Sequence, residues 1–326
     1  MKIGLIGAGA WGMALAVCLS GRHQVTLWAR SDAQRKLLRA THRHEYLAGI
    51  ELPSNIVIAT DRDEMIAASD VVLVATPTAA LREMLIQVAR VAAGKPVIGA
   101  CKGFEQGTSL LPHQIAAGIL GKTTSYAALS GPSFALEVAQ GLPAALTLAS
   151  ADEAFAAAMS RELHHSRFRI YFTPDIMGVE VGGAVKNVMA IATGIADGLK
   201  LGLNARAALI TRGLAELTRL GVAMGGRIET FIGLAGAGDL VLTCTGALSR
   251  NRRVGLELAA GKPIGEVLAQ LGHVAEGVHT AAAAAAVARR HGVDMPITHA
   301  VCAVLFEDMP PRDAVEQLLS RDPRQE

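Results

Sequence analysis

Lys186 is the only formally charged residue in a long apolar stretch, between Glu180 and Asp197. An ammonium group there loses hydration unless a partner or a ligand compensates. Burial should lower the pKa of this lysine from its usual value of about 10.4, which would suit it to proton transfer. Gly182 and Gly183, one turn earlier, are expected to leave room for a ligand beside the ammonium. The alternative is a structural lysine that extends its four-carbon stem to the surface, which is commoner for a lone lysine on a helix.

Three glycines near the N-terminus have the spacing of a dinucleotide-binding loop. In "GLIGAGAWG", Gly7, Gly9 and Gly12 follow a predicted strand and open a predicted helix. The first would make the turn, the second would let a pyrophosphate approach the backbone, and the third would let helix and strand pack closely. The pattern alone is not specific, but its position in a strand-helix-strand unit predicts a bound dinucleotide over a merely tight turn.

Arg30 follows the second predicted strand, in "LWARSD", at a position that distinguishes the two nicotinamide cofactors. An acidic residue there binds the ribose hydroxyls of NAD, whereas an arginine accommodates the 2′-phosphate of NADP. Arg30 therefore favours NADP, or tolerance of both NADP and NAD. The alternative is a solvated Arg30, with Asp32 as the ribose ligand.

Two further loops follow predicted strands and could hold an anion. Lys102, in "GACKGF", lies just beyond the fifth strand, where ligands bind in open α/β sheets. In "LSGPSFALEV" a strand ends at Gly131 and a helix is expected to have Pro132 in its first turn, which leaves the Ser133 hydroxyl and nearby amides for an anion. An exposed loop lysine and ordinary helix capping are the alternatives.

The second half of the chain has two polar segments of interest. "GLAGAGDLVLTCTG" lacks the third glycine and the preceding strand of a dinucleotide loop, so we predict a pliable loop that presents Asp239. In "LSRNRRVG", Ser249, Arg250 and Asn251 offer a hydroxyl, a guanidinium and an amide that together suit a phosphate group. A solvated helix start with three arginines is the alternative.

The elements that must position these residues change in kind near residue 174. Before it, short β-branched runs alternate with helical segments and predict the eight strands "KIGLIG", "QVTLWA", "NIVIAT", "VVLVAT", "PVIGAC", "YAALS", "AALTLAS" and "FRIYF". After it we expect only helices: about 175–197, one from the N-cap Asn204 to about Leu220, and more over 249–320. The fold class is therefore α/β. Residues 1–174 form a doubly wound, Rossmann-type, mostly parallel sheet that binds the dinucleotide, and residues 175–326 form an all-helical domain.

The composition excludes several classes of protein. With 31 basic and 29 acidic residues the net charge is only +2, which argues against a nucleic-acid partner. The four cysteines are far apart and indicate neither zinc nor disulfides, which fits a reducing cytoplasm. His42, His44, His164 and His165 lack suitably spaced partners, so we expect no metal. No uninterrupted apolar run is long enough to predict a membrane span, and we expect a soluble chain.

Taken together, the motifs resemble the bacterial-type NAD(P)-dependent glycerol-3-phosphate dehydrogenase family over nearly the whole chain. The resemblance rests on "KIGLIGAGAWG", "CKGF", "SGPSFALEVAQGLPAAL", "GGAVKNVMAIATGIADGL", "GDLVLTCTG" and "SRNRRVG", in that order. It implies reversible hydride transfer between dihydroxyacetone phosphate and sn-glycerol 3-phosphate, mostly as the reduction that supplies phospholipid backbones.

The resemblance also implies roles for individual residues. Lys186 would be the proton acceptor or donor. Apart from the resemblance, we expect the Asp239 carboxylate to oppose the fall in the pKa of Lys186 and to orient its amine. The substrate contacts would be Lys102, Gly131, Ser133, Asp239, Ser249, Arg250 and Asn251. The cofactor contacts that it implies are Ala10, Trp11, Arg30, Lys102, Gly131, Ala135, Arg250, Val274 and Glu276, and they join the loop glycines Gly7, Gly9 and Gly12 inferred above. Ala10 departs from the family, which commonly has serine there, so a hydroxyl contact to the cofactor phosphate is lost while the backbone amide remains.

The sequence leaves two other functions open. A related NADP-dependent dehydrogenase acting on another small hydroxy compound would keep the glycine loop and Lys186 but would not need Ser249, Arg250 and Asn251. A non-enzymatic NADP-sensing module would need only the features of the N-terminal half. The expected partner is a small phosphorylated substrate, and a homodimer is an option that the sequence does not decide.

Overall fold

The computed structural model describes residues 1–121, 123–271 and 275–322, and the chain divides into two compact units. The first unit comprises residues 1–102 and 110–176, and the second comprises residues 103–109 and 177–326. The main change of unit, after Ile176, lies close to the boundary expected at residue 174. The segment Gly103–Ser109, directly after Lys102, groups with the second unit, which the sequence did not indicate.

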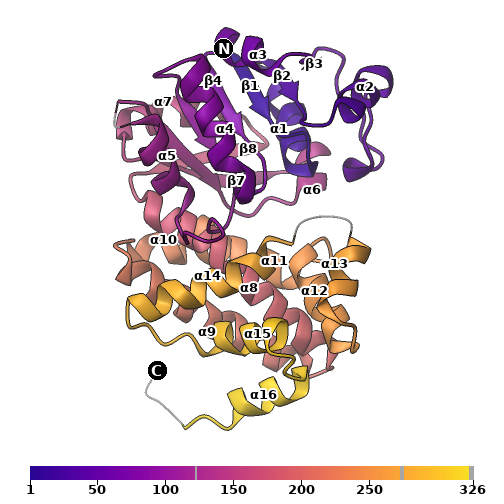
Figure 1. Ribbon diagram of the computed structural model, residues 1–326, viewed down its shortest axis with the longest axis vertical. Coiled ribbons are helices and arrows are strands. Elements are labelled where there is room, and N and C mark those ends of the chain that lie inside the picture. Colours follow the sequence, from indigo (N-terminus) through magenta and orange to yellow (C-terminus); the bar gives the residue numbers. More distant parts are fainter. Residues whose placement is uncertain (122, 272–274, 323–326) are drawn as a thin grey trace. The chain divides into compact units, whose positions relative to one another are not determined.

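An eight-stranded sheet forms the centre of the first unit (Figure 1). Its order is β3-β2-β1-β4-β5-β6-β7-β8, and all neighbours are parallel except β6 and β7. The strands are β1 (Lys2–Ile6), β2 (Gln24–Trp28), β3 (Val57–Ile58), β4 (Val71–Val74), β5 (Val97–Gly99), β6 (Tyr126–Ser130), β7 (Ala144–Ala149) and β8 (Phe168–Thr173). All eight predicted strands and the mostly parallel sheet are therefore confirmed.

Helices cover both faces of this sheet. They are α1 (Ala10–Ser20), α2 (Asp32–Thr41), α3 (Arg62–Ala68), α4 (Thr78–Val91), α5 (Pro112–Leu120), α6 (Ala135–Ala139) and α7 (Glu153–Leu163), with a 3₁₀ turn at Glu45–Leu47. Successive residues of β4 point to opposite faces, so Val71 and Leu73 join one core with α1, while Val72 and Val74 join another with α4. Because both faces are covered, β4 is apolar throughout, as a buried parallel strand should be.

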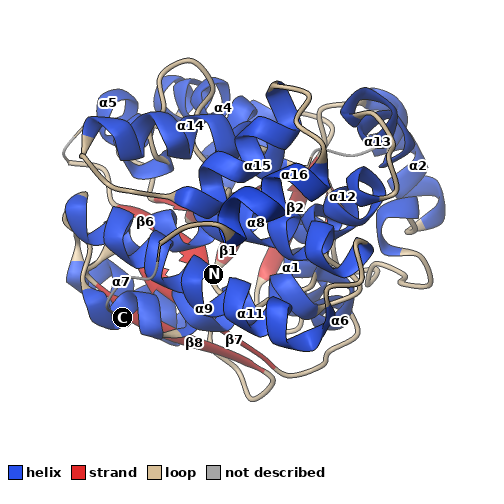
Figure 2. Ribbon diagram, turned by 90° about the horizontal axis from the view of Figure 1, so that it is seen from below, coloured by secondary structure: helices blue, strands red, loops and turns tan. Residues whose placement is uncertain are grey.

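The described residues of the second unit contain helices and no strand (Figure 2). The helices are α8 (Ile176–Gly198), α9 (Gly202–Ala223), α10 (Ile228–Ile232), a π-helical turn (Leu234–Gly238), α11 (Asp239–Thr245), α12 (Arg250–Ala259), α13 (Ile264–Leu271), α14 (Glu276–Arg290), α15 (Pro296–Phe306) and α16 (Pro311–Leu319). The expected helical character is confirmed. The N-cap expected at Asn204 is wrong, because α9 already begins at Gly202, after Leu201.

Helix α8 is the core helix of the second unit, since every residue over 178–196 is buried. Its glycines let other helices approach at backbone distance. A Cβ on Gly194 would lie 2.1 Å from the Arg252 carbonyl oxygen, and a Cβ on Gly255 would lie 2.1 Å from the Ile191 carbonyl oxygen. Among the described helices α8 alone is long and apolar enough to cross a membrane, but 83% of its apolar window is buried within the protein, as expected of a core helix.

Candidate active site

The glycine loop after β1 has the geometry that its sequence predicts. Gly7 has a φ of 113°, which other residues rarely adopt, and its amide donates to the Trp28 carbonyl at 2.9 Å. A Cβ on Gly9 would meet no atom within 4 Å, so the backbone there is open to a ligand. A Cβ on Gly12 would lie 1.8 Å from the Gly7 carbonyl oxygen, so only glycine lets α1 pack against the turn. These features fit a dinucleotide pyrophosphate.

Helix α1 begins immediately after this loop, at Ala10, with Trp11 next. The described residues of its first turn include no acidic residue, and no side chain caps the turn. Its amides and the positive end of the helix dipole therefore suit a phosphate group. Ala10 can contribute its backbone amide, although it lacks a hydroxyl.

Basic side chains surround the end of β2. Arg30 is exposed, and within the described part of the chain its guanidinium has no hydrogen-bonding or ionic partner. Asp32 begins α2, and its carboxylate oxygens accept hydrogen bonds from Arg35 at 3.2 Å and from Lys36 at 2.9 Å. The hydrogen bond from Lys36 is the largest cause of a lowered pKa of Asp32. The alternative ribose ligand is thus already engaged by two cations.

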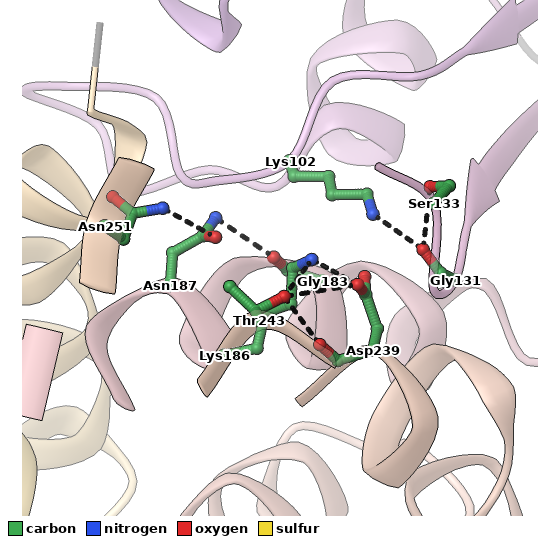
Figure 3. Close-up of polar contacts among 9 residues, drawn as sticks. All are labelled: Lys102, Gly131, Ser133, Gly183, Lys186, Asn187, Asp239, Thr243 and Asn251. Carbon is green, nitrogen blue, oxygen red and sulfur yellow. Dashed lines mark hydrogen bonds and ion pairs between the residues drawn. The ribbon is translucent and has the colours of Figure 1, made fainter. Parts of the chain in front are cut away.

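Lys102, Gly131 and Ser133 meet beyond the adjacent ends of β5 and β6 (Figure 3). The Lys102 ammonium donates to the Gly131 carbonyl at 3.1 Å, and the Ser133 hydroxyl donates to the same oxygen at 2.9 Å. Gly131 has a φ of 140°, and a Cβ there would lie 3.0 Å from the Leu146 Cα. The reading of Lys102 as an exposed loop lysine is wrong, because the residue is half-buried and bonded.

The helix after Gly131 begins later than expected. Helix α6 starts at Ala135 with Phe134 as its N-cap, so Pro132 and Ser133 precede it and the prediction of Pro132 in the first turn is wrong. Phe134 has extended backbone angles that the helix cannot include. Ser133 consequently bonds the Gly131 carbonyl instead of capping α6.

Lys186 is buried, with 6% of its surface exposed, and does not extend to the surface. Its ammonium donates to the Asp239 carboxylate and, at 2.9 Å, to the Thr243 hydroxyl (Figure 3). Asp239 is itself 1% exposed, and Thr243 donates to the Asp239 backbone carbonyl at 2.6 Å. The sequence missed Thr243. Its spacing of four from Asp239 would have placed both on one helix face if α11 had been predicted.

The segment before Asp239 is a π-helical turn, so the prediction of a pliable loop is wrong. Small residues make this turn feasible, since a Cβ on Gly236 would lie 2.0 Å from the Phe231 carbonyl oxygen. The turn also occupies the space that Gly182 was expected to leave for a ligand. A Cβ on Gly182 would lie 2.6 Å from the Ala235 carbonyl oxygen, so this glycine admits the π-helical turn that leads to Asp239.

The three arginines that follow Ser249 at the start of α12 differ in their surroundings. Ser249 is the N-cap, and its hydroxyl accepts from the Arg252 amide at 3.2 Å. Arg252 donates through Nε and Nη2 to Asp197 at 2.9 and 2.7 Å, and Arg253 lies 3.9 Å from Glu257. Ordinary capping therefore accounts for the Ser249 hydroxyl, whereas Arg250 is exposed at the first position of the helix.

Asn251 lies in a buried amide network. Its Nδ2 donates to Asn187 Oδ1 at 2.9 Å, and its Oδ1 accepts from the Gly277 amide at 3.0 Å. Asn187, next to Lys186, was not predicted as a site residue, and only packing of α12 on α8 reveals it. Glu276 begins α14 directly before Gly277. Val274, the remaining predicted cofactor contact, lies outside the described residues.

The histidine pairs have structural partners. His164 Nδ1 accepts from the Ile170 amide at 3.2 Å, and His165 Nε2 lies 3.1 Å from Cys18 Sγ. His44 Nδ1 accepts from the Tyr46 amide at 3.2 Å. Within the described residues no three His, Cys, Asp or Glu side chains are grouped as a metal site would require.

Fold and site together define a class of protein. A doubly wound sheet with an open glycine loop, and a helical unit with a buried lysine bonded to a carboxylate, are the features of a nicotinamide-dependent oxidoreductase.

The chain belongs to the NAD-dependent glycerol-3-phosphate dehydrogenase family. The N-terminal part of that family matches residues 2–156, and the C-terminal part matches residues 175–316. The glycerol-3-phosphate dehydrogenase [NAD(P)+] of Dechloromonas aromatica is 54% identical over 327 residues, which cover 100% of this chain and 99% of that protein. The protein of the same name from Thiobacillus denitrificans is 53% identical, with 100% of both chains covered.

A solved structure agrees with this assignment. The glycerol-3-phosphate dehydrogenase of Coxiella burnetii superposes with a TM-score of 0.94 at 41% identity, over 98% of this chain and 99% of that chain. The family and the Rossmann-type fold expected from the sequence are therefore confirmed.

Proposed function

We propose that this chain catalyses reversible hydride transfer between NAD(P)H and dihydroxyacetone phosphate, with sn-glycerol 3-phosphate as the reduced product and phospholipid synthesis as its use. Membership of the family supports both the reaction and the cofactors. One observation carries the proposal: the buried ammonium of Lys186 is bonded to Asp239 and Thr243, and ketone reduction needs a proton donor held in place. Residues 1–174 would be the dinucleotide-binding domain and residues 175–326 the helical substrate-binding and catalytic domain, with some contacts of each ligand in the other part of the chain.

The bound nicotinamide would supply the hydride, and the first unit would hold the dinucleotide. The pyrophosphate would lie against the Gly9 backbone and the amides of Ala10, Trp11 and Gly12. Arg30 would face the ribose end, where its guanidinium suits a 2′-phosphate. Ala135, Glu276, Val274, Lys102, Gly131 and Arg250 remain proposed cofactor contacts.

Lys186 would donate a proton to the ketone oxygen during reduction and would take it back during oxidation. Asp239 and Thr243 would fix the position of its amine. Burial would lower the pKa of Lys186, whereas the nearby Asp239 carboxylate would raise it. The fall in this pKa therefore remains a prediction. Arg250 would bind the substrate phosphate through its planar fork. Asn251, Ser249, Lys102, Gly131 and Ser133 complete the proposed substrate contacts.

We also propose that the protein works in the cytoplasm and forms a homodimer. All four cysteines are free, which fits a reducing compartment. Size-exclusion chromatography with light scattering on the purified chain would decide the oligomeric state, and a monomer at micromolar concentration would contradict the dimer.

The function is tested by following the absorbance of NADPH or NADH with two ketones, dihydroxyacetone phosphate and dihydroxyacetone. We expect oxidation of both cofactors with the phosphorylated ketone and little with its analogue, because a site built for a phosphate loses much of its binding energy without it. Equal rates with both ketones would favour a dehydrogenase for another hydroxy compound. Tight NADPH binding without turnover of either ketone would favour a sensing module.

A further inference from the structure

Helix α2 bonds the backbone on both sides of the proposed cofactor site. Gln34 Nε2 donates to the Ala8 carbonyl of the glycine loop at 2.7 Å. The next residue, Arg35, bonds the end of β2: its Nη1 donates to the Ala29 carbonyl at 2.6 Å and to the Arg30 carbonyl at 3.1 Å. Neighbouring side chains of one helix thus hold the two loops that the cofactor would contact.

Arg35 is fixed by more than these carbonyls. Its Nη2 donates to Asp32 at 3.2 Å, and its guanidinium carbon lies 5.8 Å from the centre of the Trp28 ring. Its side chain is 15% exposed, compared with 73% for Lys36, the other cation bonded to Asp32. The Arg35 side chain of α2 is therefore held against the loop by several contacts, whereas Lys36 is a solvated surface partner whose contribution to structure should be small.

We propose that Arg35 is a positioning residue that sets the preference for NADPH over NADH. It acts in two ways. By holding the Ala29 and Arg30 carbonyls it fixes the backbone from which the Arg30 side chain extends, so that less conformational entropy is lost when Arg30 binds a 2′-phosphate. Together with Lys36 it also occupies the Asp32 carboxylate, which would otherwise accept hydrogen bonds from the ribose hydroxyls of NADH. The proposal rests on the proposed role of Arg30.

The test compares dissociation constants for NADPH and NADH, measured by calorimetric titration, in the wild type and in Arg35→Gln, Lys36→Gln and Arg30→Ala. We expect Arg35→Gln to reduce the preference for NADPH by about tenfold, as when one charge-assisted contact is weakened. Lys36→Gln removes a cation from the same carboxylate but leaves the loop bonds, so the preference should change less than about twofold. Turnover at saturating cofactor should stay near wild type in Lys36→Gln.

Each arm has a result that overturns a different statement. If Arg30→Ala abolishes the preference while Arg35→Gln leaves it intact or weakens both cofactors equally, Arg35 is merely structural. If Arg30→Ala leaves the preference unchanged, the proposed role of Arg30 fails, and the role of Arg35 fails with it. Arg35→Lys keeps the charge near Asp32 but loses the planar guanidinium that bonds two carbonyls. It replaces Arg35→Gln in the test if that variant does not fold. We expect it to lose most of the preference.

Discussion

Replacing Lys186 with Met separates the chemical role of the lysine from its structural role. Methionine is similar in length and apolar, but the substitution leaves the carboxylate of Asp239, 1% exposed, without its cation. Removing one partner of a buried ion pair costs about 3 to 5 kcal/mol, because the remaining charge is desolvated and unpaired. We therefore expect Lys186→Met to be folded but less stable by about this amount at neutral pH.

The double variant Lys186→Met, Asp239→Asn is the matched control. A neutral amide replaces the unpaired carboxylate, and Thr243 remains beside it as a hydrogen-bonding partner. Most of the lost stability should return, because the penalty belongs to the buried charge.

Urea unfolding of each variant at neutral pH measures the stability, and cofactor oxidation measures turnover. Both variants should lose about 10² to 10⁴ in turnover, since each lacks the proposed proton donor. A double variant that is stable and turns over within a few-fold of the wild type would refute the chemical role of Lys186. A single variant as stable as the wild type at neutral pH would refute the buried-pair reasoning.

Three further outcomes follow from other parts of the structure. Arg250→Lys keeps the charge but loses the fork, so the KM for dihydroxyacetone phosphate should rise about tenfold with kcat little changed, and inorganic sulfate should compete with substrate in the wild type. Gly194→Ala should lower the free energy of unfolding by about 3 kcal/mol or prevent folding, because its Cβ would lie 2.1 Å from the Arg252 carbonyl oxygen. Thermal unfolding measures this loss, and an unchanged midpoint would show that α8 and α12 can move apart at little cost. Burial raises the pKa of Glu216 to about 7, so the folded state holds a proton there that the unfolded state has released, and stability should fall by about 3 kcal/mol as the pH rises from about 4.5 to 7. Glu216→Gln, which mimics the protonated acid, should flatten this part of the pH profile, and an unchanged profile would show that Glu216 is ionised throughout.

Features within short stretches of chain could be predicted from the sequence. The glycine loop could be predicted from its spacing and from its position between a strand and a helix. The contact of Gly12 with the Gly7 carbonyl oxygen is local, whereas a Cβ on Gly7 would lie 2.7 Å from the carbonyl oxygen of the distant Ala75. The strands followed from runs of β-branched residues, and their parallel arrangement followed from the helices between them. The buried lysine was visible as a charge in an apolar helix, but its partners were not.

The tertiary structure decided what lies against each of these residues. Lys186 and Asp239 are 53 positions apart, and no local pattern fixes such a contact. Gly182 illustrates the difference: the sequence explains why a helix can be approached closely there, but only packing determines that the π-helical turn, and not a ligand, fills the space. Arg35 is a second example, because no sequence pattern around it indicates that its side chain bonds the backbone at the end of β2. The sequence determined most of the elements and the chemical groups available to this protein, because both depend on residues that are near in the chain. The tertiary structure determined which groups contact one another, because burial and distance are properties of the packed chain.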